Sequence, residues 1–181
     1  MKPVYSNPKG HHIHSPFAFE LVSKVIFRSD CQAEKDLLKT WDVTHHIKRR
    51  MLLIRRLIEF FQPENIWVPS GKVEMMKLVS DGLQEVKTEY YENTQLPGFT
   101  FRNEFVIVDK PVGIPEMIPV TDCNSVWFIC SSDMSEKGDY FSGFKNHPKV
   151  SQTYALKNCG IVIFNPRYQK QDFIIRGNYS L

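Results

Sequence analysis

Residues 55–71 read RRLIEFFQPENIWVPSG, and this stretch decides the fold. Its first residues belong to an amphipathic helix that is predicted over 46–61. Pro63 ends this helix, because proline is not tolerated in a helix interior. The short apolar run at 65–68 then predicts a strand that ends at Pro69-Ser70-Gly71. A second helix is predicted over 72–84. A strand between two helices is typical of a parallel α/β sheet.

Further short apolar runs follow toward the C-terminus. Strands are predicted at 86–91, 105–108, 125–130, 152–156, 160–164 and 172–176, and a short helix at 134–146. The three prolines of 111–120 exclude a long helix there. Apolar runs without alternation are typical of strands covered on both faces. Because helices come early and hairpins late, we expect a Rossmann-like α/β fold with a mostly parallel sheet and an antiparallel C-terminal hairpin.

Before the deciding stretch, the chain has an arm followed by helices. Residues 1–16 hold three prolines and three histidines and are expected to be extended. Ser15 and Pro16 are a good helix cap and first-turn residue, so a helix is predicted over 16–28, with another helical stretch at 32–41. We therefore expect one compact domain, with an N-terminal arm and helices at 1–62 and the Rossmann-like sheet at 63–181.

Composition limits the classes of function. The 181 residues are 42% hydrophobic, enough for a buried core, and carry a net charge of +3. The basic residues at 48–50 and 55–56 are interpreted as a solvated helix face, with no strong nucleic-acid signal. No apolar run approaches the ~18 residues of a membrane span. The four cysteines form no CxxC pair, which favours free thiols and a cytoplasmic location.

Two terminal segments resemble a known family. GHHIHSPFAFELVSKVI at 10–26 resembles the N-terminal helix of a bacterial group of class I S-adenosylmethionine (SAM) methyltransferases, which often carry a His-Ser-Pro-Phe signature. HPKVSQTYALKNCGIVIFNPRYQKQDFIIR at 147–176 resembles the final hairpin of the same group. Between them, FVIVDK at 105–110 and SVWFICSSD at 125–133 stand where the family has its fourth and fifth strands. The resemblance implies a reduced version of the methyltransferase fold.

The cofactor loop departs from the family pattern. There, the first strand leads into an acidic-x-Gly-x-x-x-Gly loop, whose glycines let the backbone approach SAM. Here the loop reads WVPSGKVE at 67–74, in which only Gly71 remains. Pro69 removes a backbone donor, and Lys72 adds a positive charge near the position of the sulfonium. We therefore expect a degenerate member that has lost SAM binding and acts as a binding or interaction module for an unknown protein or small molecule.

The alternative is an active SAM-dependent methyltransferase with an atypical loop. In that case the resemblance implies that Ser70, Gly71, Glu89 and Asp109 contact the cofactor. Glu89 would hold the ribose hydroxyls from the end of the second strand, a role for which Glu92 is a second candidate, and Asp109 matches the strand-end aspartate of the family's fourth strand. The methyl acceptor and a catalytic base stay unidentified.

Histidines and cysteines are the other residue types that could form a site. His11, His12 and His14, with His45 and His46, match no metal-binding motif, so no metal is expected. Cys123 and Cys130 adjoin apolar strands and are interpreted as buried and inert. The wide apolar face of 47–61 is consistent with a homodimer.

Overall fold

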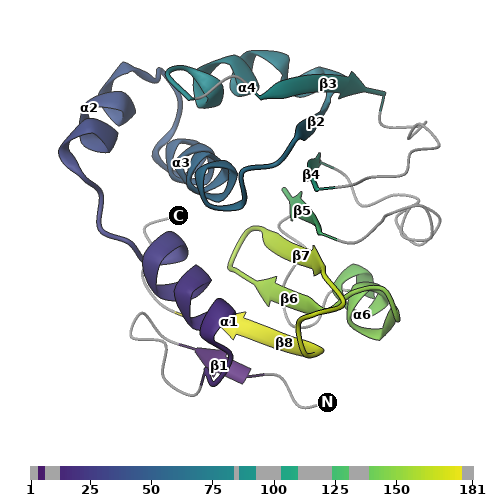
Figure 1. The fold of residues 1–181 in the computed structure, drawn as a ribbon. Helices are drawn as coiled ribbons and strands as arrows, with labels where there is room; N and C mark the ends of the chain where they lie inside the picture. The colour runs from purple at the N-terminus through teal and green to yellow at the C-terminus, as the bar shows by residue number, and fades with distance from the viewer. Residues whose placement is uncertain are drawn as a thin grey trace.

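An eight-stranded sheet runs through the computed structural model, with helices packed against its two faces (Figure 1). The structure describes residues 4–6, 13–83, 86–92, 103–109, 124–130 and 139–176, and only the backbone of 4–6 and 139–142. The predicted loops at 92–103 and 111–120 and the first part of the helix predicted at 134–146 fall mostly outside the described residues, as do His11, His12 and Cys123.

The strand order is β1-β8-β6-β7-β5-β4-β2-β3. Within the described residues every paired strand runs parallel to its neighbours except β7, which is antiparallel to both β5 and β6. The predicted Rossmann-like α/β fold with an antiparallel C-terminal hairpin is thus confirmed. The strands are β1 Val4–Ser6, β2 Asn65–Pro69, β3 Lys87–Tyr91, β4 Glu104–Val108, β5 Ser125–Ile129, β6 Gln152–Ala155, β7 Gly160–Phe164 and β8 Gln171–Ile175.

Helices precede and connect the strands. They are α1 Pro16–Glu20, continued by the π-helix η1 Leu21–Ile26, then α2 Gln32–Thr40, α3 His45–Phe61, the 3₁₀ turn η2 Ser70–Lys72, α4 Val73–Ser80 and α6 Asp139–Asn146. Ser15 caps α1 by accepting a hydrogen bond from the Ala18 amide at 3.3 Å, as its sequence position predicts. The helix predicted over 72–84 ends early because the chain turns at Gly82, which has a φ of 69°.

The sequence pattern predicted an extended arm at 1–16 and did not predict the strand β1 within it. It pairs in parallel with β8, with Val4 opposite Phe173, and lies at one edge of the sheet (Figure 1). The arm therefore belongs to the same sheet as residues 63–181. A three-residue run between prolines has too few side chains to show a strand period.

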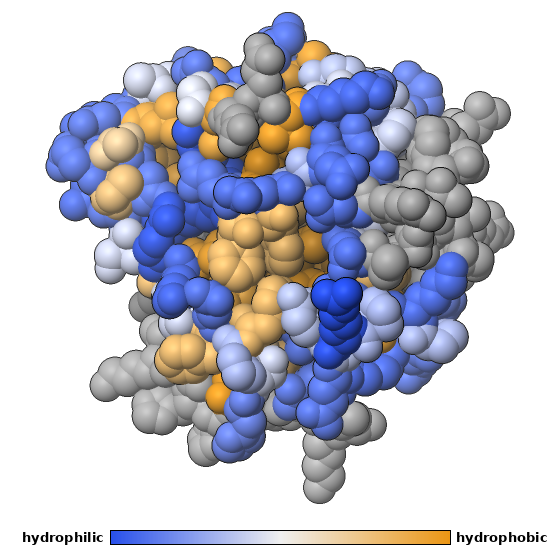
Figure 2. Space-filling view, viewed as in Figure 1, coloured by the Kyte–Doolittle hydropathy of each residue, from blue (hydrophilic) through white to orange (hydrophobic). Residues whose placement is uncertain are grey.

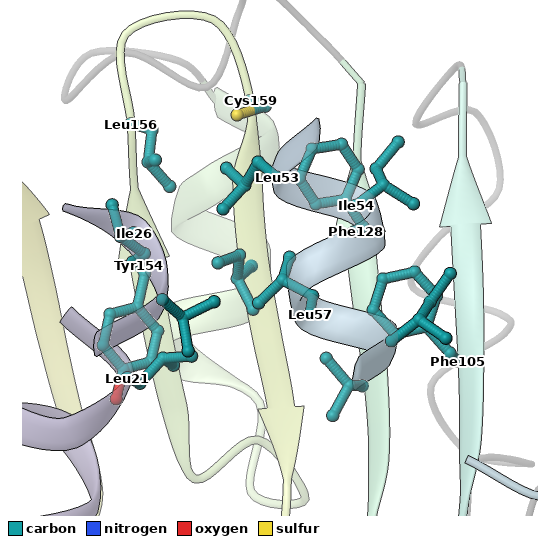
Figure 3. Close-up of a cluster of buried hydrophobic side chains, with 14 of the residues drawn as sticks. Leu21, Ile26, Leu53, Ile54, Leu57, Phe105, Phe128, Tyr154, Leu156 and Cys159 are labelled. Carbon is teal, nitrogen blue, oxygen red and sulfur yellow. The ribbon is translucent and has the colours of Figure 1, made fainter. Parts of the chain in front are cut away.

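α3 forms the centre of the larger core. Its buried Leu53, Ile54 and Leu57 face the side chains of Phe105 and Phe128 on the sheet (Figure 3). α3 ends in Gln62, whose left-handed φ of 44° turns the chain into β2. Because that turn feeds the amino end of β2, the first residues of α3 lie toward the carboxyl ends of the parallel strands.

An ion-pair network fixes α2 against α3. Arg56 is only 3% exposed, and its guanidinium donates to both oxygens of Glu34 at 2.8 and 2.7 Å and to Asp30 at 2.9 Å. Arg28 also pairs with Glu34, and Arg49 with Asp30. The expectation of a solvated basic face is therefore wrong for these arginines, because the loop before α2 and its first turn bring carboxylates against α3.

Half-buried aromatic rings meet at the carboxyl end of α3. Phe17 stacks on Tyr168 with centroids 4.0 Å apart and lies 6.1 Å from both Phe60 and Phe61. Apolar side chains gather near the middle of the face shown in Figure 2, where α3 and α1 come together. In the described part of the chain, no helix is long and apolar enough to cross a membrane.

Candidate functional site

The strand order reverses at β2, because the next two strands of the chain lie on opposite sides of it. From β2 the chain passes through α4 to β3 on one side, and β4 then pairs with β2 on the other. In open α/β sheets, ligands bind outside the carboxyl ends of the strands at such a switch point. The candidate site therefore lies where β2 and β4 end. We call the side of the sheet that holds the carboxyl ends of the parallel strands the carboxyl edge.

An ion pair joins the two strand ends. Lys72, the last residue of η2, lies after β2, and Asp109 directly follows β4. The Lys72 Nζ atom is 3.2 Å from Asp109 Oδ1, and the two side chains are 34% and 26% exposed. Of the residues that the sequence identified, Asp109 and the loop residue Lys72 are thus brought into contact, and both remain open to solvent.

Ser70 and Gly71 directly precede Lys72 after the end of β2. They belong to η2, and no side chain caps this turn. A Cβ built on Gly71 would meet no atom of the described residues within 4 Å, and the φ of Gly71 is not in the left-handed region. Among the described residues, neither close packing nor backbone conformation requires a glycine here.

Glu89 lies away from the carboxyl edge. It is the middle residue of β3, opposite Trp67 of β2, and its carboxylate pairs with Lys87 Nζ at 2.7 Å. This ion pair raises the pKa of Lys87. Glu92, the alternative, directly follows β3 and is exposed, so it is the acidic residue at the carboxyl end of that strand.

Tyr91 and Cys130 border the same edge. Tyr91 is buried at the end of β3 and donates its hydroxyl to the Ile107 carbonyl at 2.6 Å, and burial raises its pKa. Cys130 follows β5, where its amide donates to the Val108 carbonyl at 2.7 Å. Burial raises the pKa of the Cys130 thiol to about 12, against the effect of Arg50 and Lys72. The thiol is therefore protonated near neutral pH and is a poor nucleophile.

Arg50 is the residue of this edge that sequence reasoning missed. It lies in the first half of α3 and donates to the Asn158 carbonyl, in the turn between β6 and β7, over 3.4 Å. The positive charge of Arg50 also acts to lower the pKa of Cys130 and of Cys159, against the effect of burial. A run of basic residues on a helix does not show which of them faces the sheet, so the pattern carried no usable signal.

The described residues hold no group of three or more histidine, cysteine or acidic side chains that could bind a metal ion. His14 is exposed before α1, and His45 and His46 are exposed at the start of α3.

No protein-family profile matches the chain, and no curated protein is significantly similar to it. The fold and the carboxyl edge therefore define the class by themselves: an α/β protein with a Rossmann-like sheet and a charged switch point.

Proposed function

We propose that this chain is a methyltransferase-like domain that has lost SAM binding and catalysis and acts as a binding or interaction module. The ion pair between Lys72 and Asp109 is the observation that carries the proposal. It spans the switch point, where a cofactor of such a domain would lie. SAM carries a positive sulfonium, which the Lys72 ammonium would repel, while Asp109 is already engaged.

The sheet agrees with the family resemblance. β2, β3, β4 and β5 are parallel, and β6 and β7 form the antiparallel hairpin that the tail resembles. Pro69 ends β2 and supplies no amide hydrogen, which further weakens the loop as a cofactor cradle. Fold alone does not carry activity, so these features support descent from a methyltransferase rather than its chemistry.

An active SAM-dependent methyltransferase with an atypical loop is the second candidate. The absence of any described atom within 4 Å of a Cβ built on Gly71 and the exposed Glu92 at the end of β3 favour it. Glu89 contributes less, because it lies within β3 and pairs with Lys87. This candidate requires the Lys72–Asp109 pair to separate when SAM arrives.

Calorimetric titration of SAM and S-adenosylhomocysteine into the folded protein distinguishes the two candidates. We expect no heat of binding from either ligand. S-adenosylhomocysteine lacks the sulfonium charge. Binding of S-adenosylhomocysteine alone would indicate repulsion of SAM by Lys72, whereas binding of neither ligand would indicate loss of the whole site. Micromolar binding of SAM that Glu92→Ala abolishes, and that Glu74→Ala on the exposed side of α4 leaves intact, would establish the active enzyme instead.

We place this module in the cytoplasm, with a protein or a small molecule as its partner. Cys31, Cys130 and Cys159 are free thiols, which suits a reducing compartment. Phe19, on α1, is 44% exposed, which supports a homodimer that buries this side chain. Light scattering of the purified protein measures the mass, and a monomer at all concentrations would exclude the dimer.

A further inference from the structure

Arg50 differs from the other arginines of α3 in its charge pairing. Arg49 pairs with Asp30, Arg55 with Glu59 at 3.3 Å, and Arg56 with Glu34 at 2.7 Å. Within the described part of the chain, no carboxylate lies within ion-pair distance of Arg50. Its guanidinium is partly buried and its hydrogen bond to the Asn158 carbonyl is 3.4 Å long. A partly buried charge without a counter-ion costs free energy, which a bound anion would offset.

Arg50 is directed to the same edge as Lys72. Asn158 follows β6, which is parallel to β5 through the antiparallel β7, so the β6–β7 turn lies at the carboxyl edge. Figure 3 shows Cys159 of this turn beside Leu53, one helical turn after Arg50. Ile129 of β5 lies opposite Gly160 at the start of β7, and the next residue, Cys130, donates its amide to the Val108 carbonyl just before Asp109. The β6–β7 turn that Arg50 contacts and the Lys72–Asp109 pair therefore lie at neighbouring strand ends.

These groups carry an excess of positive charge. Two cations face one carboxylate, and Lys72 and Asp109 are exposed enough for a ligand to reach them. No described atom lies within 4 Å of a Cβ built on Gly71, the neighbour of Lys72. The same charges that disfavour a sulfonium therefore favour an anion.

We propose that the carboxyl edge binds a small molecule through a phosphate group, held by Arg50 from α3 and Lys72 from η2. The planar guanidinium matches phosphate oxygens in a two-bond geometry, and the ammonium adds a point charge. Asp109 competes with the ligand for Lys72 and so limits its affinity. This inference rests on the proposed loss of SAM binding and names the ligand class of the resulting module.

Titration of inorganic pyrophosphate into the full chain at low salt tests the proposal. We expect Arg50→Gln and Lys72→Gln each to weaken binding by about tenfold, because each removes a charged donor. Asp109→Asn is expected to tighten it. Lys77→Gln is the matched control, because Lys77 is 62% exposed on α4 and pairs with Glu74 away from this edge. Far-UV circular dichroism confirms that each variant is folded.

Absence of heat from the folded wild-type protein, or equal weakening by Lys77→Gln, would overturn the proposal. A parallel titration with ADP separates two sources of the phosphate: tighter binding than pyrophosphate indicates a nucleotide, and equal binding indicates a simpler phosphate, and either supports the site. SAM in the same calorimeter keeps the two conclusions apart. Heat from SAM refutes the proposed function, whereas silence from both SAM and pyrophosphate refutes only the phosphate site.

Discussion

Gly71 and Gly82 flank α4 and place different demands on a side chain. A Cβ on Gly71 would meet no described atom within 4 Å, and its backbone needs no positive φ. Gly82 has a φ of 69°, a conformation that strains any residue with a Cβ. Gly71 is thus the less constrained of the two glycines.

Gly71→Ala is expected to stabilise the protein by about 0.4 to 1 kcal/mol, because alanine lowers the entropy of the unfolded chain without strain in the folded one. Gly82→Ala is expected to destabilise it by about 1 to 2 kcal/mol, since alanine must adopt the left-handed conformation. Urea unfolding measures both. A destabilising Gly71→Ala would show that this backbone needs glycine after all.

Single residues also mark what the sequence could predict of the site. Asp109 was identified through the resemblance to the strand-end aspartate of the methyltransferase family, and Lys72 as a departure from that family's loop. Their contact could not be read from the sequence, because it depends on β2 and β4 being neighbours. Arg50 was missed because its role depends on the rotation of α3, and Glu89 was placed at a strand end that lies at Tyr91.

Among the elements, α2 shows how a polar helix is held. Its one buried side chain is the carboxylate of Glu34, which also accepts from the Cys31 amide at 2.9 Å. Arg56 of α3 therefore anchors α2 by charge where other helices use apolar contacts. A buried ion pair adds little when intact, but the loss of one partner leaves an uncompensated charge.

Arg56→Met is expected to destabilise the protein by up to about 3 kcal/mol, because Glu34 loses its buried partner, although Arg28 still pairs with Glu34 and Arg49 with Asp30. Lys39→Met is the control, since Lys39 is 72% exposed and its pair with Asp36 is solvated. Urea unfolding monitored by circular dichroism gives both free energies. Similar small losses in the two variants would show that the network does not anchor α2.

Most elements could be predicted because each has its own pattern. α3 shows a helical period, and β4, β5 and β7 are short apolar runs that are buried throughout. β1 and the early end of α4 escaped prediction for different reasons. β1 forms only by pairing with β8, and α4 ends where Asp81 and Gly82 turn the chain, which outweighs the helical pattern beyond.

For the whole molecule, Glu34 ties stability to pH. Hydrogen bonds from Arg56, the Cys31 amide and Arg28 outweigh burial and lower its pKa from 4.5 to about 2. A carboxyl group whose pKa is lower in the folded state stabilises the protein above its unfolded pKa, and this contribution is lost as the pH falls toward the folded value.

We therefore expect the free energy of unfolding to fall between about pH 5 and pH 2, with Glu34 contributing at most about 3 kcal/mol of the loss. In Glu34→Gln this loss should be smaller, although the variant is less stable at neutral pH. Glu74→Gln is the control, since Glu74 is 85% exposed. Urea unfolding at a series of pH values measures the slopes. Equal slopes in wild type and Glu34→Gln would place the acid sensitivity elsewhere.

The parallel pairing of β1 with β8 has a consequence for biosynthesis. Among the described strands, the ribosome synthesises β1 before all others and its partner β8 after all others. During translation β1 has no partner strand, while α3, β2 and β4 can already assemble. The sheet is therefore completed at this edge only after β8 has left the exit tunnel, and until then the unpaired edges of β1 and β6 are places where a chaperone or a neighbouring nascent chain can pair.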